Sequence, residues 1–267
     1  MSKQERWSKL LELLAVEGRI DVEEAAESVG VSPATIRRDL DGLAEQRMLV
    51  RTRGGAIAHG VSYELPLRYK SSRHASEKQR IAAAVVDLLG VGDVVGLNGG
   101  TTTTEVARAL ALQAGGSPPG EPWENSSGPA YTVVTNALNI AGELAVRPQF
   151  KIVVTGGVAR PQTYELVGPL TAGVLNEVVL DVAVLGVDGV DPQLGVMTHQ
   201  EDEAAISRLF TERARRVILA TDSSKMGRRA FARICGLDRV DVLVTDSGLS
   251  PDLAARLTEA GIEVVTV

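Results

Sequence analysis

The sequence predicts an α/β protein built from two unequal domains. Its 267 residues exceed the usual length of a single domain. Residues 1–58 contain short capped helices followed by a basic hairpin, and residues 77–267 alternate short Val-, Ile- and Leu-rich runs with stretches of helical periodicity. The segment 59–76 between them is punctuated by Gly, Ser and Pro and is expected to be a linker.

Two helices are predicted at the start of the chain. Apolar residues between 6 and 16 recur on one helical stripe, which ends at Gly18. Asp21 stands three residues before Glu24, an acidic version of the capping box, and predicts a short helix over 22–28.

A third helix is predicted to begin at Pro33 and to continue over 35–45. Ser32 can cap this helix, and Pro33 suits its first position. Its apolar residues recur every three or four positions and are expected to face inward. The charged residues expected to face outward are Arg37, Arg38 and Asp41.

Two short strands are predicted next, at 48–52 and 56–58. We expect Gly54-Gly55 to join them through a tight turn that needs positive φ. Three helices followed by such a hairpin make a winged helix-turn-helix.

The remaining residues predict a mostly parallel sheet. Their apolar runs lack polar alternation, so both faces of each strand should be covered by helices. Strands are expected at 94–97, 132–135, 151–155, 181–187, 216–221, 240–245 and 264–267. Helices are expected at 77–88, 103–112, 137–145, 166–176 and 201–214. Residues 113–130 are rich in Gly, Pro and Ser and predict a surface loop.

Composition narrows the class of protein. The net charge of −6 argues against a protein that coats nucleic acid, but residues 31–60 carry five arginines against three carboxylates. With Cys235 as the sole cysteine and only three histidines, we expect neither an internal disulfide nor a metal site. No apolar stretch is long enough to cross a membrane, and we expect a cytosolic protein.

The arginines of the N-terminal domain form a candidate DNA surface. A recognition helix enters the major groove by its N-terminal end, where short polar side chains and free amides can meet phosphate. The arginines that follow can reach guanine edges or phosphates, and arginines on a hairpin can reach the backbone or the minor groove. A solvated charged face is the alternative, but the coincidence of these features favours double-stranded DNA. The expected contacts are Ser32, Pro33, Thr35, Arg37, Arg38, Arg51 and Arg53.

A Gly- and Thr-rich segment, Asn98-Gly99-Gly100-Thr101-Thr102-Thr103-Thr104, lies between a predicted strand and a predicted helix. Its amides, its hydroxyls and the helix N-terminus suit a phosphate group. The segment lacks a GxGxxG spacing and a Walker lysine, which argues against dinucleotides and nucleoside triphosphates, so no cofactor is expected. A Gly-rich turn with a Thr helix cap is the alternative interpretation.

Three further loops should gather with this segment at the C-terminal edge of the sheet, where α/β proteins bind ligands. Asp188 and Asp222 could accept hydroxyl hydrogen bonds and Lys225 could neutralise an anion, a combination that a phosphorylated polyol requires. A surface lysine and a helix-capping aspartate are the alternative interpretations of Lys225 and Asp222. The candidate effector residues are Asn98, Gly99, Gly100, Thr101, Thr102, Thr103, Gly156, Gly157, Asp188, Gly189, Asp222 and Lys225.

Three motifs resemble the DeoR family of bacterial transcriptional regulators. They are Arg6-x-x-x-Leu10-x-x-x-Leu14, Ser32-x-x-Thr35-Ile36-Arg37-Arg38-Asp39-Leu40 and Arg51-Thr52-Arg53-Gly54-Gly55-Ala56. The resemblance spans almost the whole chain. It implies a C-terminal domain similar to ribose-5-phosphate isomerase, which binds a sugar phosphate and usually releases a repressor from DNA. It also adds Glu201 to the candidate effector residues. The chain departs from the family's pattern at Asn98, where many members carry Asp, and in its long 113–130 segment.

Together these features predict a DNA-binding regulator, a repressor of a carbohydrate-use operon controlled by a phosphorylated sugar. Paired heads would match the two-fold symmetry of DNA half-sites, so a homo-oligomer, dimer or tetramer, is expected. One alternative is a sugar-phosphate isomerase with an appended DNA-binding domain, in which the same carboxylates and lysine would transfer protons. Another is a constitutive DNA-binding protein whose larger domain only assembles the oligomer.

Overall fold

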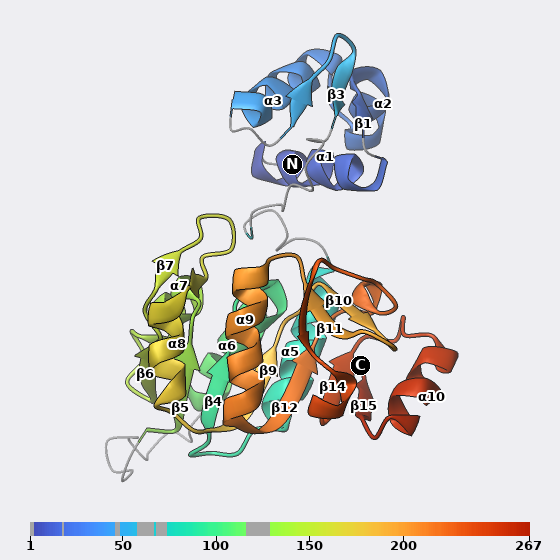
Figure 1. The fold of residues 1–267 in the computed structure, drawn as a ribbon. Coiled ribbons are helices and arrows are strands. Elements are labelled where there is room, and N and C mark those ends of the chain that lie inside the picture. Colours follow the sequence, from blue (N-terminus) through green and yellow to red (C-terminus); the bar gives the residue numbers. More distant parts are fainter. Residues whose placement is uncertain (1–2, 18, 46–48, 58–66, 68–73, 116–128) are drawn as a thin grey trace. The chain divides into compact units, whose positions relative to one another are not determined.

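The computed structural model describes residues 3–17, 19–45, 49–57, 67, 74–115 and 129–267. The chain divides into two compact units, residues 1–73 and 74–267, and each is described by itself (Figure 1). The predicted linker lies outside the described residues except for Leu67 and its last three positions, where a helix already begins at Ala75. Most of the predicted surface loop, residues 116–128, also lies outside them.

The N-terminal unit contains the predicted helices and hairpin, with one added strand. Its elements are α1 (Lys3–Glu17), β1 (Arg19–Asp21), α2 (Val22–Val29), α3 (Pro33–Glu45), β2 (Val50–Arg51) and β3 (Gly55–Ile57). Within the described part, the strands form a three-stranded antiparallel sheet in the order β1-β3-β2. The added strand, β1, is too short for sequence periodicity to reveal it.

The helix boundaries of this unit follow the predicted caps. Asp21 accepts hydrogen bonds from the amides of Glu23 and Glu24 at 2.8 and 3.4 Å, and Gly30 ends α2 with a φ of 73°. The inward-facing residues of α3 are fully buried, as their periodicity predicts: Ile36, Leu40 and Leu43.

The turn of the hairpin differs from the prediction. Neither Gly54 nor Gly55 has a positive φ. Gly55 is needed for a different reason, because β3 pairs with β1 and an added Cβ on Gly55 would lie 1.7 Å from the Ile20 carbonyl oxygen. The close approach of β1, which was not predicted, therefore explains why position 55 requires a glycine.

Among the described residues, the C-terminal unit is built on a seven-stranded parallel sheet in the order β15-β14-β12-β9-β4-β5-β6. Its strands are β4 (Val94–Leu97), β5 (Tyr131–Thr135), β6 (Phe150–Val154), β9 (Leu180–Leu185), β12 (Ala214–Ala220), β14 (Val242–Thr245) and β15 (Glu263–Thr266). All of the predicted strands and their parallel arrangement are confirmed.

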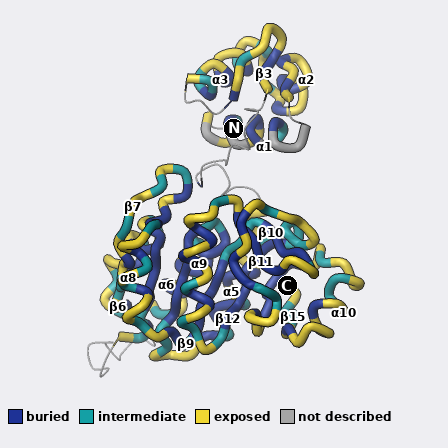
Figure 2. The backbone as a smooth tube through the Cα atoms, in the orientation of Figure 1, coloured by how far each residue is buried: buried dark blue, intermediate teal, exposed yellow. Residues whose placement is uncertain are grey.

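Helices cover both faces of this sheet, as the unbroken apolar strands predict. One hydrophobic core joins the sheet to α5 (Ala75–Asp87), α6 (Thr101–Gly115) and α7 (Leu138–Leu144). The other joins it to α8 (Pro169–Asn176), α9 (Glu201–Arg213) and α10 (Pro251–Glu259). Figure 2 shows the central strands buried between these layers. Within the described ranges, no helix is both long and apolar enough to cross a membrane.

Several short elements of this unit were not predicted. β10 (Gly189–Asp191), β11 (Gly195–Thr198) and β13 (Ala232–Cys235) form a second, antiparallel sheet, and β7 (Val158–Ala159) pairs with β8 (Leu166–Val167). The helix predicted over 166–176 therefore begins only at Pro169. Such short strands form through pairing with distant segments, which local periodicity does not record.

Candidate DNA interface and anion-binding site

The start of α3 presents the predicted DNA-reading side chains. Ser32 Oγ lies 2.9 Å from Thr35 Oγ1 and accepts a hydrogen bond from the Thr35 amide at 3.2 Å, so Ser32 caps the helix. Arg37 and Arg38 are exposed. Arg37 Nη2 donates to Glu23 Oε1 at 2.9 Å, an exposed ion pair worth at most about 1 kcal/mol that a DNA phosphate can replace.

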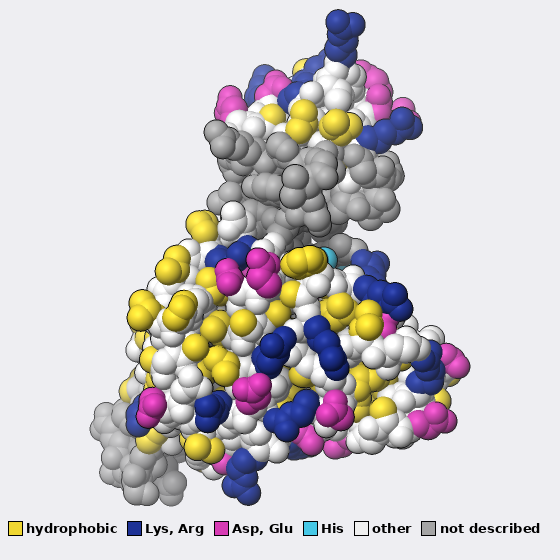
Figure 3. Space-filling model, viewed as in Figure 1, with side chains coloured by type: hydrophobic (Ala, Val, Ile, Leu, Met, Phe, Trp, Pro, Cys, Tyr) yellow, Lys and Arg dark blue, Asp and Glu magenta, His cyan; other side chains and the backbone are white. Residues whose placement is uncertain are grey.

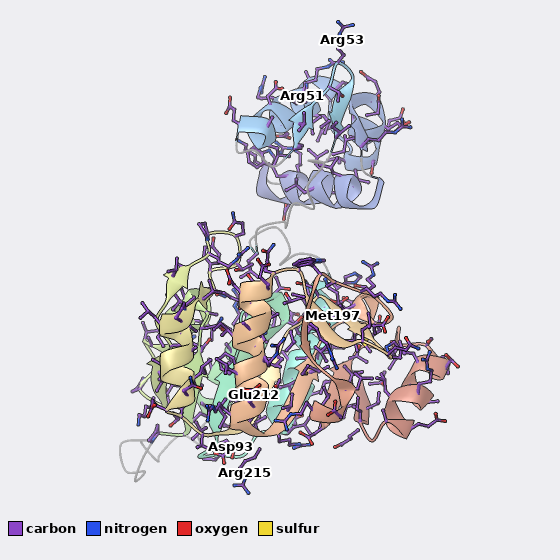
Figure 4. All side chains as sticks on the ribbon, viewed as in Figure 1. Arg51, Arg53, Asp93, Met197, Glu212 and Arg215 are labelled. Carbon is purple, nitrogen blue, oxygen red and sulfur yellow. The ribbon has the colours of Figure 1, made fainter. Side chains whose placement is uncertain are left out.

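The two hairpin arginines have different surroundings. Arg51 Nε donates to Asp41 Oδ1 of α3 at 2.7 Å, and Arg51 Nη1 donates to the Gly55 carbonyl. Arg53 is exposed and points away from the unit at the tip of the hairpin (Figure 4). Arg51 therefore orients the hairpin against α3, whereas Arg53 is free of such a contact with α3 among the described residues, and DNA contact by both arginines stays a prediction.

A buried carboxylate outside the predicted site holds α3 in place. Asp39 accepts hydrogen bonds from Arg6 Nε at 2.7 Å, Arg6 Nη2 at 3.2 Å and Trp7 Nε1 at 2.9 Å. The hydrogen bond that Arg6 donates to Asp39 raises the pKa of Arg6 above its usual value. The sequence does carry a signal for this role: Asp39 is charged but lies three positions after Ile36, on the inward face of the helix.

In the C-terminal unit, Asn98 clamps two neighbouring strands together. It is buried where β4 ends, and its Nδ2 donates to the Gly186 carbonyl at 2.9 Å and to Ser207 Oγ at 3.1 Å. Its Oδ1 accepts from the Gly186 amide at 2.8 Å. Both donor hydrogens of the side-chain amide are therefore used within the protein. Asn98 therefore positions the loops that follow β4 and β9, and its direct contact with a ligand stays a prediction.

The clamp sets the Gly-Thr segment against the loop after β9. An added Cβ on Gly186 would lie 3.4 Å from the Gly99 carbonyl oxygen and 3.4 Å from Thr103 Cγ2. Two of the predicted loops are therefore in contact at the C-terminal edge of the sheet, as the topology predicts.

Backbone amides rather than hydroxyls are the donors that this segment offers. Gly100 has a φ of 133°, a region that favours glycine, and α6 begins directly after it at Thr101. Thr102 and Thr103 are buried, and Thr103 Oγ1 donates to the Gly100 carbonyl at 3.2 Å. The first amides of α6 have no acceptor within their own helix, which makes a glycine turn followed by a helix a suitable seat for phosphate.

Asp188 and Lys225 form an ion pair in the segments that follow β9 and β12. Lys225 Nζ lies 3.7 Å from Asp188 Oδ1. Asp188 Oδ2 accepts from Thr198 Oγ1 at 2.9 Å and from the His199 amide at 3.2 Å. Because Asp188 follows Gly186 by two residues, the carboxylate and the ammonium group lie at the edge that carries the glycine turn.

The segment that carries Lys225 is held from two sides. Asp246, which follows β14, accepts from the Ser223 amide at 2.6 Å and from Ser223 Oγ at 2.7 Å. Burial raises the pKa of Asp246, but these hydrogen bonds outweigh burial and the pKa lies below its usual value. On the other side, an added Cβ on Gly189 would lie 2.6 Å from the Arg228 carbonyl oxygen. Gly189, the first residue of β10, therefore allows this segment to pack closely against the strand. No local pattern in the sequence indicates this role.

Asp222 belongs to the same support. It is buried and caps the short 3-10 helix η2 (Ser223–Lys225), accepting hydrogen bonds from the amide of Ser224 at 3.2 Å and from the Ser224 hydroxyl. The helix-cap interpretation therefore describes Asp222 Oδ1, and contact of this carboxylate with a ligand hydroxyl stays a prediction.

Three other candidate residues have structural contacts or exposure of their own. Gly157 has a φ of 121° and packs on α8, where an added Cβ would lie 2.1 Å from Thr171 Oγ1. Thr171 Oγ1 donates to the Gly156 carbonyl at 2.7 Å, so both glycines pack against α8. Glu201 is exposed at the start of α9. The place of these three residues in the effector site stays a prediction.

Two further carboxylates of the C-terminal unit, Glu165 and Glu203, are buried and were not among the predicted site residues. Glu203 lies 3.0 Å from Arg160 Nε and accepts from Thr163 Oγ1 at 2.8 Å. Glu165 packs over the glycine turn, since an added Cβ on Gly99 would lie 2.2 Å from Glu165 Cγ. The predicted ligand loops directly follow predicted strands, and neither carboxylate lies in such a loop.

An ion pair next to the Lys225 segment gives the first testable prediction. Arg229 Nε donates to Asp191 Oδ2 at 2.7 Å, and the amides of Leu194 and Gln193 add two further hydrogen bonds. These contacts lower the pKa of Asp191 to about 2, with the Arg229 bond contributing most.

Because the pKa of Asp191 is lower in the folded state, its stabilisation is complete above about pH 4 and is lost as the pH falls toward 2. An Asp191→Asn variant should therefore melt below the wild type by a constant interval near neutral pH, and the interval should narrow below about pH 4. Thermal melts over a pH series measure this interval. An interval that stays constant down to pH 3 would contradict the assigned role of Asp191.

The arrangement at the strand edge suits a small anion that carries hydroxyl groups. Helix amides and the ammonium group of Lys225 match a phosphate, and the carboxylate of Asp188 matches a hydroxyl donor. In the part of the chain that the structure describes, no cluster of three or more His, Cys, Asp or Glu side chains could hold a metal ion.

Comparison with known proteins agrees with both units. A DeoR-like helix-turn-helix domain matches residues 6–60, and a DeoR C terminal sensor domain matches residues 73–247. The chain is 31% identical to the glycerol-3-phosphate regulon repressor of Escherichia coli K12, over 99% of both chains. It is 34% identical to the HTH-type transcriptional regulator GlpR of Haloferax volcanii, over 99% of this chain and 98% of that protein.

Among solved structures, ribose 5-phosphate isomerase A of Methanocaldococcus jannaschii is similar over 57% of this chain and 55% of its own, with 16% identity and a TM-score of 0.40. The full-length relatives are named as regulators of transcription, so the isomerase alternative is not favoured and the protein is not an enzyme. The two domain matches and the full-length relatives show that this chain belongs to the DeoR family of transcriptional regulators.

Proposed function

We propose that this protein represses a carbohydrate-use operon in the cytoplasm and leaves its operator when a phosphorylated sugar or polyol binds at the strand edge. The observation that carries the proposal is the meeting of Lys225, Asp188 and the glycine turn at one edge of the sheet. A cation and free helix amides bind a phosphate, and the neighbouring carboxylate accepts a hydroxyl hydrogen bond.

Glycerol 3-phosphate is the first effector to test, because one full-length relative is named the glycerol-3-phosphate regulon repressor. For release from DNA, the effector must bind the DNA-competent and DNA-incompetent states with different affinities, since equal affinity would shift nothing. A gel-shift titration against operator DNA, with inorganic phosphate and unphosphorylated glycerol as controls, tests this function. DNA occupancy that no phosphorylated sugar or polyol alters would contradict it.

A constitutive DNA-binding protein is the second candidate, and a thermal-shift measurement separates the two. A bound effector raises the melting temperature in proportion to its occupancy. If phosphorylated ligands leave melting unchanged while operator binding is strong, the constitutive function is correct.

Arg38 provides the direct test of the DNA surface. It is exposed on α3, and its replacement by alanine should weaken operator binding and lower the slope of log K against log salt by about 0.9 for each phosphate that the guanidinium neutralises. Arg215→Ala is the matched control, because Arg215 is an exposed arginine of the C-terminal unit, 3.7 Å from Asp181. Equal affinity and salt slope in Arg38→Ala and the wild type would remove Arg38 from the interface.

A further inference from the structure

One flank of the C-terminal unit exposes a set of large hydrophobic side chains. Val158 on β7 is 68% exposed and Leu170 on α8 is 73% exposed, and Val154, Tyr164 and Leu138 are exposed beside them. In Figure 3 hydrophobic side chains gather on the flank that Figure 1 assigns to β7 and α8. We call these five residues the apolar flank.

Hydrogen bonds join the segments that carry the apolar flank along the β6 edge of the sheet. β7 pairs with β8, which leads directly into α8. At the end of β6, the Gly156 carbonyl accepts from Thr171 Oγ1 of α8 at 2.7 Å. At the other end of the β7–β8 hairpin, the amide of Leu138 donates to the Tyr164 carbonyl at 3.0 Å.

Charge is nearly absent from this part of the chain. Residues 152–176 contain only Arg160 and Glu165 as charged residues, whereas 23% of the whole chain is charged. Arg160 is turned toward Glu203, 3.0 Å away, and Glu165 is buried. A surface without charges is typical of the core of a protein interface and not of a solvated face.

The size of the apolar flank fits one half of a dimer interface. Its five side chains expose on the order of 500 Å² of apolar surface, the upper end of what an ordinary monomer leaves open in one patch. A stable interface buries about 800 Å² on each partner, and homodimer interfaces are about 65% apolar. The apolar area therefore matches what one copy contributes to a homodimer.

The lack of charge favours a second copy of this chain as the occupant. Near a two-fold axis each residue meets its own copy, so a charged residue there would meet a like charge, and an uncharged surface avoids this cost.

We propose that the apolar flank is the surface through which two copies of this chain assemble by two-fold symmetry. The assignment goes beyond the proposed function, which calls for paired DNA-reading heads but does not say which surface pairs them. It places the contact on Val158 and Leu170, next to the hairpin whose Glu165 packs over the glycine turn.

Sedimentation equilibrium of the full chain, with Leu170→Asp and Val158→Asp as variants, tests this assignment. Leu170 lies in the first turn of α8, where an aspartate favours the helix, so the folded unit should tolerate the charge. Burying two unpaired charges should raise the dissociation constant by roughly 100-fold or more and halve the mass of the assembly at micromolar concentration. Val91→Asp is the matched control, because Val91 is 84% exposed in the turn before β4.

The assignment is supported if both flank variants dissociate, Val91→Asp does not, and circular dichroism melts show all three folded. It is overturned if the wild type is monomeric or if folded Leu170→Asp and Val158→Asp keep the wild-type mass. If one variant does not fold, the other decides. The thermal shift with glycerol 3-phosphate is measured on the same samples, so that a failed effector function and a failed assembly surface give different results.

Discussion

Replacing Lys225 with alanine should leave operator binding intact and weaken the response to a phosphorylated effector by about 10- to 100-fold. The expected loss is large because the ammonium group, which pairs with Asp188, is the cation of the proposed phosphate site. Its removal takes away a charge-assisted hydrogen bond to phosphate and leaves the Asp188 carboxylate to repel the anion. Effector titrations of DNA release, and isothermal calorimetry of effector binding, measure the change.

Lys151→Ala is the matched control, because Lys151 is an exposed lysine on β6 of the same unit. DNA binding should remain at the wild-type level in both variants, since neither residue belongs to the N-terminal unit. A Lys225→Ala protein that releases DNA at the wild-type effector concentration would show that Lys225 is not part of the site.

Asp39→Ala should destabilise the N-terminal unit by about 3 kcal/mol and remove most operator binding. The carboxylate is buried, and its loss removes the acceptor that the Arg6 guanidinium and the Trp7 indole N–H share. A unit of this size has a total stability of only a few kcal/mol, so a loss of this magnitude unfolds a measurable fraction of it. Urea unfolding followed by Trp7 fluorescence reports the change.

Asp41→Ala distinguishes the loss of a buried acceptor from the loss of any carboxylate on α3. Asp41 accepts from Arg51 at 2.7 Å, but its side chain is 61% exposed, so its replacement should cost no more than about 1 kcal/mol. The C-terminal unit should keep its unfolding transition and its effector binding in both variants. Equal stabilities of Asp39→Ala and Asp41→Ala would contradict the role assigned to Asp39.

The helix caps and the parallel strands could be predicted, because their signals lie in short stretches of sequence. Asp21 and Ser32 cap helices because a side-chain oxygen can reach amides two or three residues ahead, and Gly30 ends a helix because it adopts positive φ at little cost. The parallel sheet was predictable from strands without polar alternation, because burial on both faces leaves that pattern. The exposed positions of Arg38 and Arg53 followed from helical and hairpin periodicity.

The supporting contacts made by the predicted site residues could be seen only in the folded protein. The Asn98 amide is used between β4 and β9, and Glu203, two residues after the predicted Glu201, is a buried carboxylate. Gly55 is needed for the approach of β1 and not for its own φ. Each of these roles depends on a partner distant in sequence, and a hydrogen bond or a steric contact between distant segments leaves no periodic trace in the chain.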